Sequence, residues 1–276
     1  MTFFRRFFDF YLESSIHTAL SCFALVRITQ QMFNISNDNS IASFAFFGTI
    51  VGYNFIKYAA LVRNQKRNMG SKLKVIWFLS FICFIIAGFY FFKLSRNAQT
   101  WAFVFLSLTL LYTLPFFPNR KNARNWAGIK IYIVALCWVG VTVVLPIFNA
   151  QIALTTDFYL KAVQRFVLLF ILILLFEIVD LKSDAWHLRT VPQQIGVRRT
   201  KILGWILLFP FYFMEFLKTV LDPWQLIVNF VLAISIGFFL FFANQNRSKY
   251  YSSFWVESVP IFWYLLLLVL NKNIIY

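Results

Sequence analysis

Long apolar runs dominate the chain, and short polar segments separate them. A membrane-spanning helix needs about 20 mostly apolar residues, and nine such runs follow one another along the sequence. They cover about residues 14–33, 41–62, 73–92, 98–117, 128–148, 158–181, 201–220, 225–243 and 254–270. The runs are continuous and lack the alternation of a membrane β-barrel. The pattern therefore predicts an all-α, polytopic bundle of about nine transmembrane helices that forms one domain over residues 1–276.

The composition supports this prediction. The chain is 61% hydrophobic and 13% charged, whereas a soluble domain is about half apolar and about a quarter charged. So few polar residues cannot cover a water-facing surface, which excludes an ordinary soluble enzyme, a disordered chain and a nucleic-acid binder. The three cysteines, Cys22, Cys83 and Cys137, lie in apolar runs. We interpret them as small packing residues, without a disulfide framework.

The charged residues predict how the chain is oriented. There are 26 Lys and Arg residues against 10 Asp and Glu residues, and cytoplasmic loops of membrane proteins collect Lys and Arg. If the N-terminus is cytoplasmic, 19 of the 26 cations fall in inner segments, and the outer segments 34–40 and 149–157 hold no cation. The basic surplus is then a signal of orientation and requires no nucleic acid. No small-residue cleavage site follows the first run, so we expect this run to be retained.

Isolated charged residues inside the apolar runs are expected to pair between helices or to reach the membrane surface. Glu215 and Lys218 are three residues apart and suited to a local pair, and Glu257 is expected to pair with a cation elsewhere. Lys161 is likewise expected to pair with a residue of another helix or to reach the membrane surface. Asp9 and Glu13 precede the first run, where we expect them to be solvated.

The densest acidic segment ends the sixth run. Three of the ten acids lie here, namely Glu177, Asp180 and Asp184. Their spacings of three and four residues place them on one helix face. Neighbouring carboxylates repel unless a cation lies among them. Mg²⁺ suits carboxylate oxygens and often bridges them to substrate phosphates. Arg189 could bind a phosphate oxygen; the alternative is that Lys182, Arg189 or a neighbouring helix simply pairs with the acids.

This segment resembles the second aspartate-rich motif of the UbiA prenyltransferase superfamily. The matching residues are Glu177, Asp180 and Asp184, followed by the Arg189-Thr-Val-Pro segment and by Gly196. A second stretch, Leu-Tyr112-Thr-Leu-Pro followed by the basic residues 122–130, resembles the family's tyrosine-x-leucine-proline stretch and its basic loop. Nine helices and a cytoplasmic N-terminus also agree with the family.

The resemblance implies an enzyme that transfers a prenyl group from an isoprenoid diphosphate to a lipophilic, often aromatic acceptor. It implies that Mg²⁺ binds to Glu177, Asp180 and Asp184, of which the two aspartates are catalytic. Further residues would contact the substrate, namely Asn54, Tyr58, Arg63, Tyr112, Arg124, Lys130 and Arg189. It also implies an integral protein of a bacterial inner membrane.

The chain departs from the family in the first aspartate motif, which should end the second run. Asn54 matches the motif's asparagine, but its three aspartate positions hold Phe55, Tyr58 and Val62. Asn54, Lys57 and Tyr58 share one helix face. An acidic face has therefore become a cationic, hydrogen-bonding one.

Two hypotheses follow from this replacement. In the first, Lys57 is catalytic and supplies part of the positive charge that the lost metal site would have given. In the second, Lys57 forms a salt bridge with Asp180 or Asp184, and the chain is a non-catalytic relative that binds a prenyl lipid or serves as an accessory protein. A transporter is a third possibility. It is disfavoured because few Gly or Pro residues interrupt the helices and the acids gather at a helix end.

Overall fold

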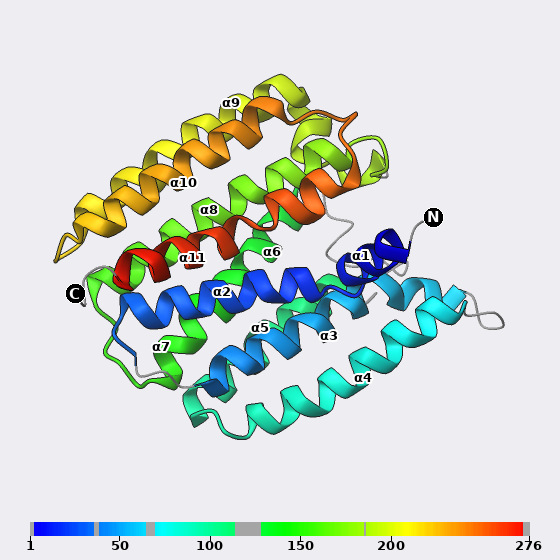
Figure 1. Cartoon of the computed structure of the whole chain (residues 1–276), viewed down its shortest axis with the longest axis horizontal. Helices are drawn as coiled ribbons and strands as arrows, with labels where there is room; N and C mark the ends of the chain where they lie inside the picture. Colours follow the sequence, from blue (N-terminus) through cyan, green and yellow to red (C-terminus); the bar gives the residue numbers. More distant parts are fainter. Residues whose placement is uncertain (1–2, 36–38, 65–69, 114–127, 185, 273–276) are drawn as a thin grey trace.

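The structure is a computed structural model that describes residues 3–35, 39–64, 70–113, 128–184 and 186–272. The regular elements within these residues are all helical. Figure 1 shows the long helices side by side, running back and forth along a common direction. The all-α prediction is therefore confirmed for the described part of the chain.

The helices follow the predicted runs closely. In chain order they are α1 (Phe3–Glu13), α2 (Ile16–Met32), α3 (Asn39–Asn64), α4 (Ser71–Phe91), α5 (Arg96–Thr113), α6 (Ile129–Val139), the π-helix η3 (Gly140–Val144), α7 (Leu145–Asn149), α8 (Thr156–Asp180), the short η4 (Trp186–Leu188), α9 (Val191–Phe213), η5 (Met214–Leu217), α10 (Pro223–Phe242), the π-helix η6 (Tyr251–Val256) and α11 (Val259–Lys272). Within the described residues, every predicted run coincides with one of these elements or with a continuous series of them. The prediction omitted α1 and started α9 too late.

Six long helical segments of the described residues are apolar enough to cross a membrane. They are Ser71–Phe91, Ile129–Asn149, Thr156–Asp180, Val191–Leu217, Pro223–Phe242 and Tyr251–Leu270. Large apolar side chains are exposed on their outer faces, for example Phe78, Phe81 and Phe84 on α4. Water disfavours such contiguous apolar faces, whereas lipid chains cover them. These are the features of a multi-pass helical membrane protein.

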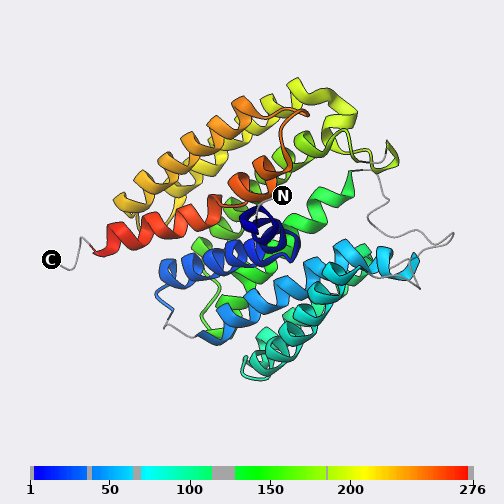
Figure 2. The ribbon, with the colours of Figure 1, turned by 45° about the vertical axis from the view of Figure 1, so that its right-hand side comes forward.

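The helices form a bundle with α8 near its middle. Figures 1 and 2 show α9 and α10 along one edge and α3 and α4 along the other. Between them, α8 packs against α6, α9 and η6. Its side chains Leu168, Ile171 and Leu174 are fully buried. Helix α8 therefore supplies the centre of the apolar core, and its two ends carry the polar groups described below.

The two ends of the bundle differ in charge. One end carries α1, the end of α3, the start of α4, the turn at residues 181–190 and the connection at residues 243–250 (Figure 1). We call it the basic end, because these segments, the first turn of α6 and the N-terminal half of α9 contain many cations: Arg5, Arg6, Lys72, Lys74, Lys130, Lys182, Arg189, Arg198, Arg199, Arg247 and Lys249. The inner segments expected from the charge pattern thus meet at one end wherever the structure describes them.

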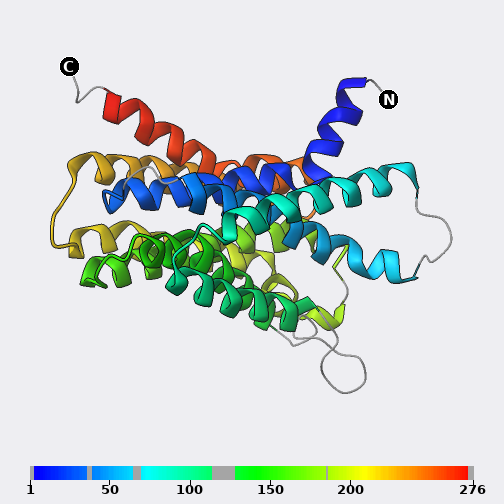
Figure 3. The ribbon, with the colours of Figure 1, turned by 90° about the horizontal axis from the view of Figure 1, so that it is seen from below.

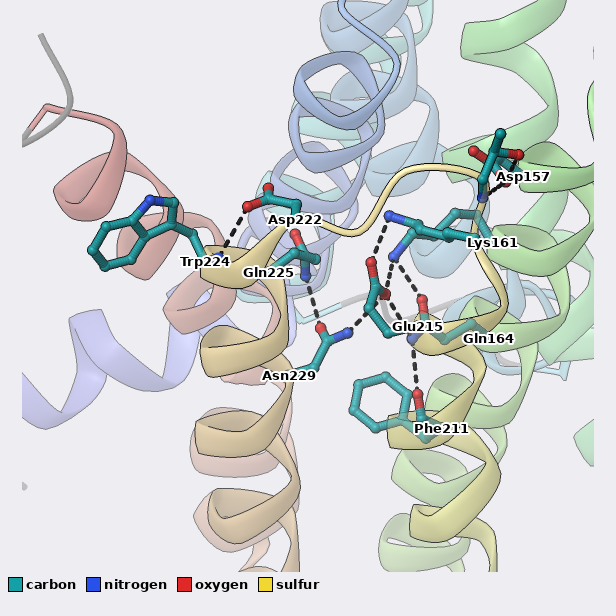
Figure 4. Close-up of polar contacts among 11 residues, drawn as sticks. Asp157, Lys161, Gln164, Phe211, Glu215, Asp222, Trp224, Gln225 and Asn229 are labelled. Atoms are coloured by element: carbon teal, nitrogen blue, oxygen red, sulfur yellow. Dashed lines mark hydrogen bonds and ion pairs between the residues drawn. The ribbon is translucent and has the colours of Figure 1, made fainter.

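A cluster of buried charges lies at the opposite end (Figure 4). Glu215 of η5 has a side-chain exposure of 0% and accepts two ammonium groups. The Lys161 Nζ atom lies 2.6 Å from its Oε2 atom, and the Lys218 Nζ atom lies 2.5 Å from its Oε1 atom. The expected local pair of Glu215 and Lys218 is therefore confirmed, and Lys161 pairs with the same acid across the helix interface.

Neutral amides complete this Glu215 cluster. Asn229 of α10 donates to the Glu215 Oε2 atom at 2.9 Å, and Gln164 of α8 donates to the same oxygen at 3.2 Å. Gln164 also accepts from Lys161 at 2.8 Å. Because α8, η5 and α10 each contribute, the cluster joins three elements through one carboxylate. A buried charge is tolerated only when it is paired and hydrogen-bonded in this way.

A second buried cation, Arg165, lies one helical turn farther along α8. Its guanidinium donates to the Leu25 carbonyl at 3.2 Å and to the Thr142 hydroxyl at 3.3 Å, and it lies 5.1 Å from the centre of the Trp263 ring. Thr142 belongs to the π-helix η3, and its backbone carbonyl accepts from Thr29 at 2.6 Å. Neutral oxygens and an aromatic face therefore solvate this charge.

Helix α1 is held to the bundle by charges at its C-terminal half. Asp9 is 5% exposed, accepts from the Tyr250 hydroxyl at 2.7 Å and lies 3.2 Å from the Lys249 ammonium. Glu13 forms ion pairs with Lys249 and with Lys72 of α4. We call these residues the α1 ion-pair cluster. The expectation that Asp9 and Glu13 are simply solvated is wrong, because α1 folds back onto the cations beside α4 and η6.

Removing the charge of Glu215 is expected to destabilise the bundle strongly. A Glu215→Gln substitution leaves Lys161 and Lys218 without their counter-charge, and breaking a buried pair in this way costs about 3–5 kcal/mol. Thermal unfolding in detergent, followed by circular dichroism, measures the change. Asp222→Asn is the matched control: Asp222 caps α10 through the Trp224 amide, and Asn keeps that acceptor. Equal stability of the two variants would contradict the prediction.

The α1 ion-pair cluster is expected to depend on pH. The Tyr250 hydrogen bond holds the pKa of Asp9 below its ordinary 3.8, burial opposes it, and the Lys249 charge adds to the lowering. Burial lowers the pKa of Lys249, but the hydrogen bond and charge of Asp9, with the charge of Glu13, raise it overall above 10.5. The contribution of Asp9 is thus complete above its unfolded pKa and is lost as the pH falls through its folded pKa. The contribution of Lys249 is complete below its unfolded pKa and is lost as the pH rises through its folded pKa.

A nitroxide label at Arg6→Cys tests this dependence through the mobility of α1. We expect a broad plateau of low mobility around neutral pH and higher mobility on acidification to about pH 3. In an Asp9→Asn background the acid transition should shrink, because one titrating group is gone. Mobility that does not change from pH 7 to pH 3 would show that these charges do not hold α1.

Candidate functional site

The acidic motif lies at the basic end, where α8 ends and turns towards α9. Glu177 is buried at 2% exposure, and Asp180 and Asp184 are half-buried. The backbone carbonyl of Asp180 accepts from the amides of Ser183 and Asp184, both at 2.8 Å. This turn folds Asp184 back, so that its carboxylate and that of Asp180 interact electrostatically.

Glu177 has a structural partner of its own. Its Oε2 atom accepts from the Val191 amide at 3.0 Å, at the start of α9. Thr190 caps the same helix, and its backbone amide donates to the Gln193 side chain at 3.0 Å. A helix start presents unpaired amides and a positive partial charge, and a carboxylate satisfies both. Glu177 therefore joins the end of α8 to the start of α9.

Asp184 is the least satisfied carboxylate of the motif. Among the described residues, its Oδ2 atom is buried without a hydrogen bond, and its ion-pair partner is the ammonium of Lys130 on α6, 3.8 Å away. Buried carboxylate oxygens nearly always have partners. This oxygen, beside the carboxylate of Asp180, therefore has capacity to accept a closer partner than Lys130.

The three acids do not meet as one metal centre. Across the residues that the structure describes, no group of three His, Cys, Asp or Glu side chains is placed to share a metal ion. Glu177 as a metal ligand stays a prediction, and its Oε2 atom already accepts from the Val191 amide. Two aspartates still fit Mg²⁺, which commonly takes one or two carboxylates and completes its shell with water and phosphate oxygens.

Arg189 lies in the turn after the motif and is exposed. Its backbone adopts a left-handed conformation with φ 44°, which is uncommon for a residue other than glycine. Its carbonyl accepts from the Gln194 amide group at 2.5 Å. The described ion pairs include none between Arg189 or Lys182 and the acids, and Lys182 donates to Asn246. A neighbouring helix does supply a partner, because Lys130 of α6 pairs with Asp184.

The α3 stretch that was compared with the first aspartate motif faces a different part of the chain. The Asn54 side chain accepts from the Ser15 hydroxyl at 2.9 Å and donates to the Ser14 carbonyl at 3.1 Å. Lys57 donates to the same Ser15 hydroxyl at 2.9 Å, and Tyr58 donates to the Glu13 carbonyl at 2.9 Å. The prediction that these side chains share one face is confirmed. That face contacts the turn between α1 and α2.

This geometry corrects the salt-bridge hypothesis. The Lys57 ammonium is bound to Ser15, and the described ion pairs include none between Lys57 and Asp180 or Asp184. The cation nearest to Asp184 is Lys130. Ser15 itself adopts a left-handed conformation with φ 62°, so the hydrogen bonds of Asn54 and Lys57 stabilise a tight turn.

Glu257, which follows η6 and precedes α11, is a polar group that the motif residues do not include. Its carboxyl group hydrogen-bonds to Thr18 of α2 and interacts electrostatically with Lys57. The Tyr53 hydroxyl, one helical turn before Lys57, accepts from the Trp138 indole at 2.6 Å. The signal in the sequence was a lone acid in an apolar run. Only folding brings this residue beside Thr18 of α2 and Lys57 of α3.

The remaining candidates divide into three cases. Tyr112 is buried at 5% exposure on α5. Arg63 belongs to α3, although its side chain is not among those described, and Arg124 lies outside the described residues. The structure therefore brings together Asp180, Asp184 and Lys130, and it separately groups Asn54, Lys57 and Tyr58.

Comparisons with protein-family models, with curated proteins and with solved structures give no match for this chain. The UbiA resemblance therefore rests on the motif residues alone.

Replacing Asn54 by Leu is expected to destabilise the junction of α1 and α2. The buried amide makes three hydrogen bonds, with Ser14, Ser15 and Ser80, and leaving buried partners unsatisfied costs about 1–3 kcal/mol each. The unfolding midpoint in detergent should fall clearly. Asn246→Leu, on the exposed connection at the same end, is the control and should have little effect. A stable Asn54→Leu protein would contradict the structural role.

Proposed function

We propose that this chain is a UbiA-like membrane prenyltransferase. It takes an isoprenoid diphosphate at the basic end and transfers the prenyl group to a lipophilic, aromatic acceptor. The observation that carries the proposal is the buried, unsatisfied Oδ2 atom of Asp184, beside Asp180 and facing Lys130. Within the same proposal, the chain crosses a bacterial inner membrane nine times and has a cytoplasmic N-terminus.

In this proposal, the carboxylates at the basic end bind the metal ion and the cations bind the diphosphate. Asp180 and Asp184 would hold Mg²⁺, which would neutralise diphosphate charge. Lys130 and Arg189 bind diphosphate oxygens, and Arg is suited to contact two oxygens at once. Glu177 keeps the end of α8 at the start of α9 and so positions both aspartates. Positive charge around the diphosphate stabilises the negative charge that develops as it leaves.

The chemistry then proceeds in the apolar interior. The allylic carbon–oxygen bond breaks, and its electron pair departs with the diphosphate. The acceptor gives an electron pair to the allylic carbon and afterwards loses a proton. The long apolar helices provide surroundings that suit the isoprenoid chain and keep water from the allylic cation. Tyr112 is a candidate to contact it through its aromatic face.

Lys57 remains a predicted catalytic cation within this proposal, and Asn54 and Tyr58 remain predicted substrate contacts. A diphosphate would have to compete with Ser15 for the Lys57 ammonium and with the 13–15 backbone for Asn54 and Tyr58. That competition favours the second candidate function: a non-catalytic protein of the same type that binds a prenyl lipid. Turnover separates the two candidates, because only the enzyme releases diphosphate.

Removing the two aspartate charges is the central test. We expect the purified protein to release diphosphate from a prenyl diphosphate in a Mg²⁺-dependent reaction. The double variant with Asp180→Asn and Asp184→Asn should lower the rate at least ~100-fold, because electrostatic stabilisation is lost. Colorimetric measurement of diphosphate across a panel of chain lengths provides the readout. Asp157→Asn removes a carboxylate from the opposite end of α8 and should leave the rate unchanged.

Two results would overturn this assignment. Unchanged turnover in the double variant would remove Asp180 and Asp184 from the reaction. Absence of turnover with every prenyl diphosphate, together with Mg²⁺-independent binding of the lipid, would support the non-catalytic protein.

A further inference from the structure

Helix α1 has two distinct faces. Its polar arc contains Arg5, Arg6, Asp9 and Glu13, and the remaining positions are aromatic or aliphatic. The C-terminal half is packed: Phe8 contacts the rings of Phe254 and Tyr250. In the N-terminal half, Phe4 is 83% exposed and Phe7 is 67% exposed. Half of an amphipathic helix therefore extends past the bundle with its aromatic side chains uncovered.

The direction of α1 also distinguishes it from the bundle. Figure 3 shows α1 leaving the bundle at a steep inclination to the long helices, at the basic end. A membrane crossed by those helices lies across their direction, so a steeply inclined helix at one end runs along the membrane surface. Amphipathic helices lie in this interface with the apolar face among the acyl chains.

The charges next to the bare aromatic residues indicate what covers them. Arg5 and Arg6 are exposed in the same turns as Phe4 and Phe7, whereas the two acids of α1 are paired with Lys249 and Lys72. The free charge of the helix is therefore positive, and it sits at the basic end. Aromatic residues flanked by arginines complement an anionic lipid surface, to which each basic residue adds about 1 kcal/mol.

We propose that α1 is an interfacial helix that binds the anionic phospholipids of the leaflet at the basic end. Phe4 and Phe7 insert among the acyl chains, and Arg5 and Arg6 contact lipid phosphates. The α1 ion-pair cluster ties this helix to the start of α4 and to the segment before α11, so lipid contact is transmitted to two helices. This binding does not depend on the prenyltransferase proposal.

The experiment uses the full chain in lipid nanodiscs with a nitroxide label at Phe7→Cys. Collision with oxygen reports an apolar surrounding, and collision with a water-soluble nickel chelate reports an aqueous one. In phosphatidylcholine with about one third phosphatidylglycerol we expect the oxygen response to dominate. A label at Asn246→Cys, on an exposed connection at the same end, is the aqueous control. Cys22 and Cys83 are buried and Cys137 is half-buried, so the same labelling of the unsubstituted chain gives the background.

A second experiment tests the role of charge. It varies the lipid composition and compares the unsubstituted arginines with the Arg5→Gln and Arg6→Gln double variant. Removing phosphatidylglycerol, or both arginines, should reduce the ratio of immersed to aqueous label by about 25-fold, roughly fivefold for each arginine. Arg198→Gln and Arg199→Gln, on α9 at the same end, are the matched control and should leave the ratio unchanged. An immersed label that responds to neither lipid charge nor the arginines would overturn the anionic-lipid assignment.

Two further outcomes would also overturn the proposal. A label that stays accessible to the nickel chelate in every lipid would show that α1 does not lie in the membrane. Dipolar broadening between labels, which disappears when labelled chains are diluted with unlabelled ones, would show that a second copy of the chain covers Phe4 and Phe7.

Discussion

An ionised side chain inside an apolar bundle must find its partners within the chain, and this constraint organises the whole structure. Glu215 is the clearest case, because it is fully buried and is surrounded by two ammonium groups and two amides from α8, η5 and α10. Without those partners the carboxylate could not remain charged there. The bundle therefore has a single permitted way to bring the ends of these elements together.

The same constraint explains why the basic end differs from the Glu215 end. At the basic end, the buried Oδ2 atom of Asp184 has no hydrogen bond among the described residues, and the Lys130 ammonium lies 3.8 Å from it. Glu177, by contrast, is satisfied by a backbone amide of α9. The two ends thus differ in how closely a lysine approaches the buried oxygen: 2.5 Å at the Glu215 Oε1 atom and 3.8 Å at the Asp184 Oδ2 atom.

The stretch compared with the first aspartate motif has a structural role of its own. Asn54, Lys57 and Tyr58 occupy the face on which that motif would stand, and they bind the turn that joins α1 to α2. Helix α1 is then connected at its other side to Lys72 and Lys249. The replaced motif thus takes part in holding an amphipathic helix at the basic end, which relates its unusual residues to α1 as well as to the proposed diphosphate site.

The sequence by itself determined the all-helical class, the positions of the helices and the gathering of cations at one end, because continuous apolar runs and charge bias are local properties. It also placed Asn54, Lys57 and Tyr58 on one face, since helix periodicity suffices for that. It missed α1, the capping role of Glu177 and the pairing of Lys161 with Glu215. Those depend on contacts between residues far apart in the chain, and only the tertiary structure decides which buried charge meets which partner.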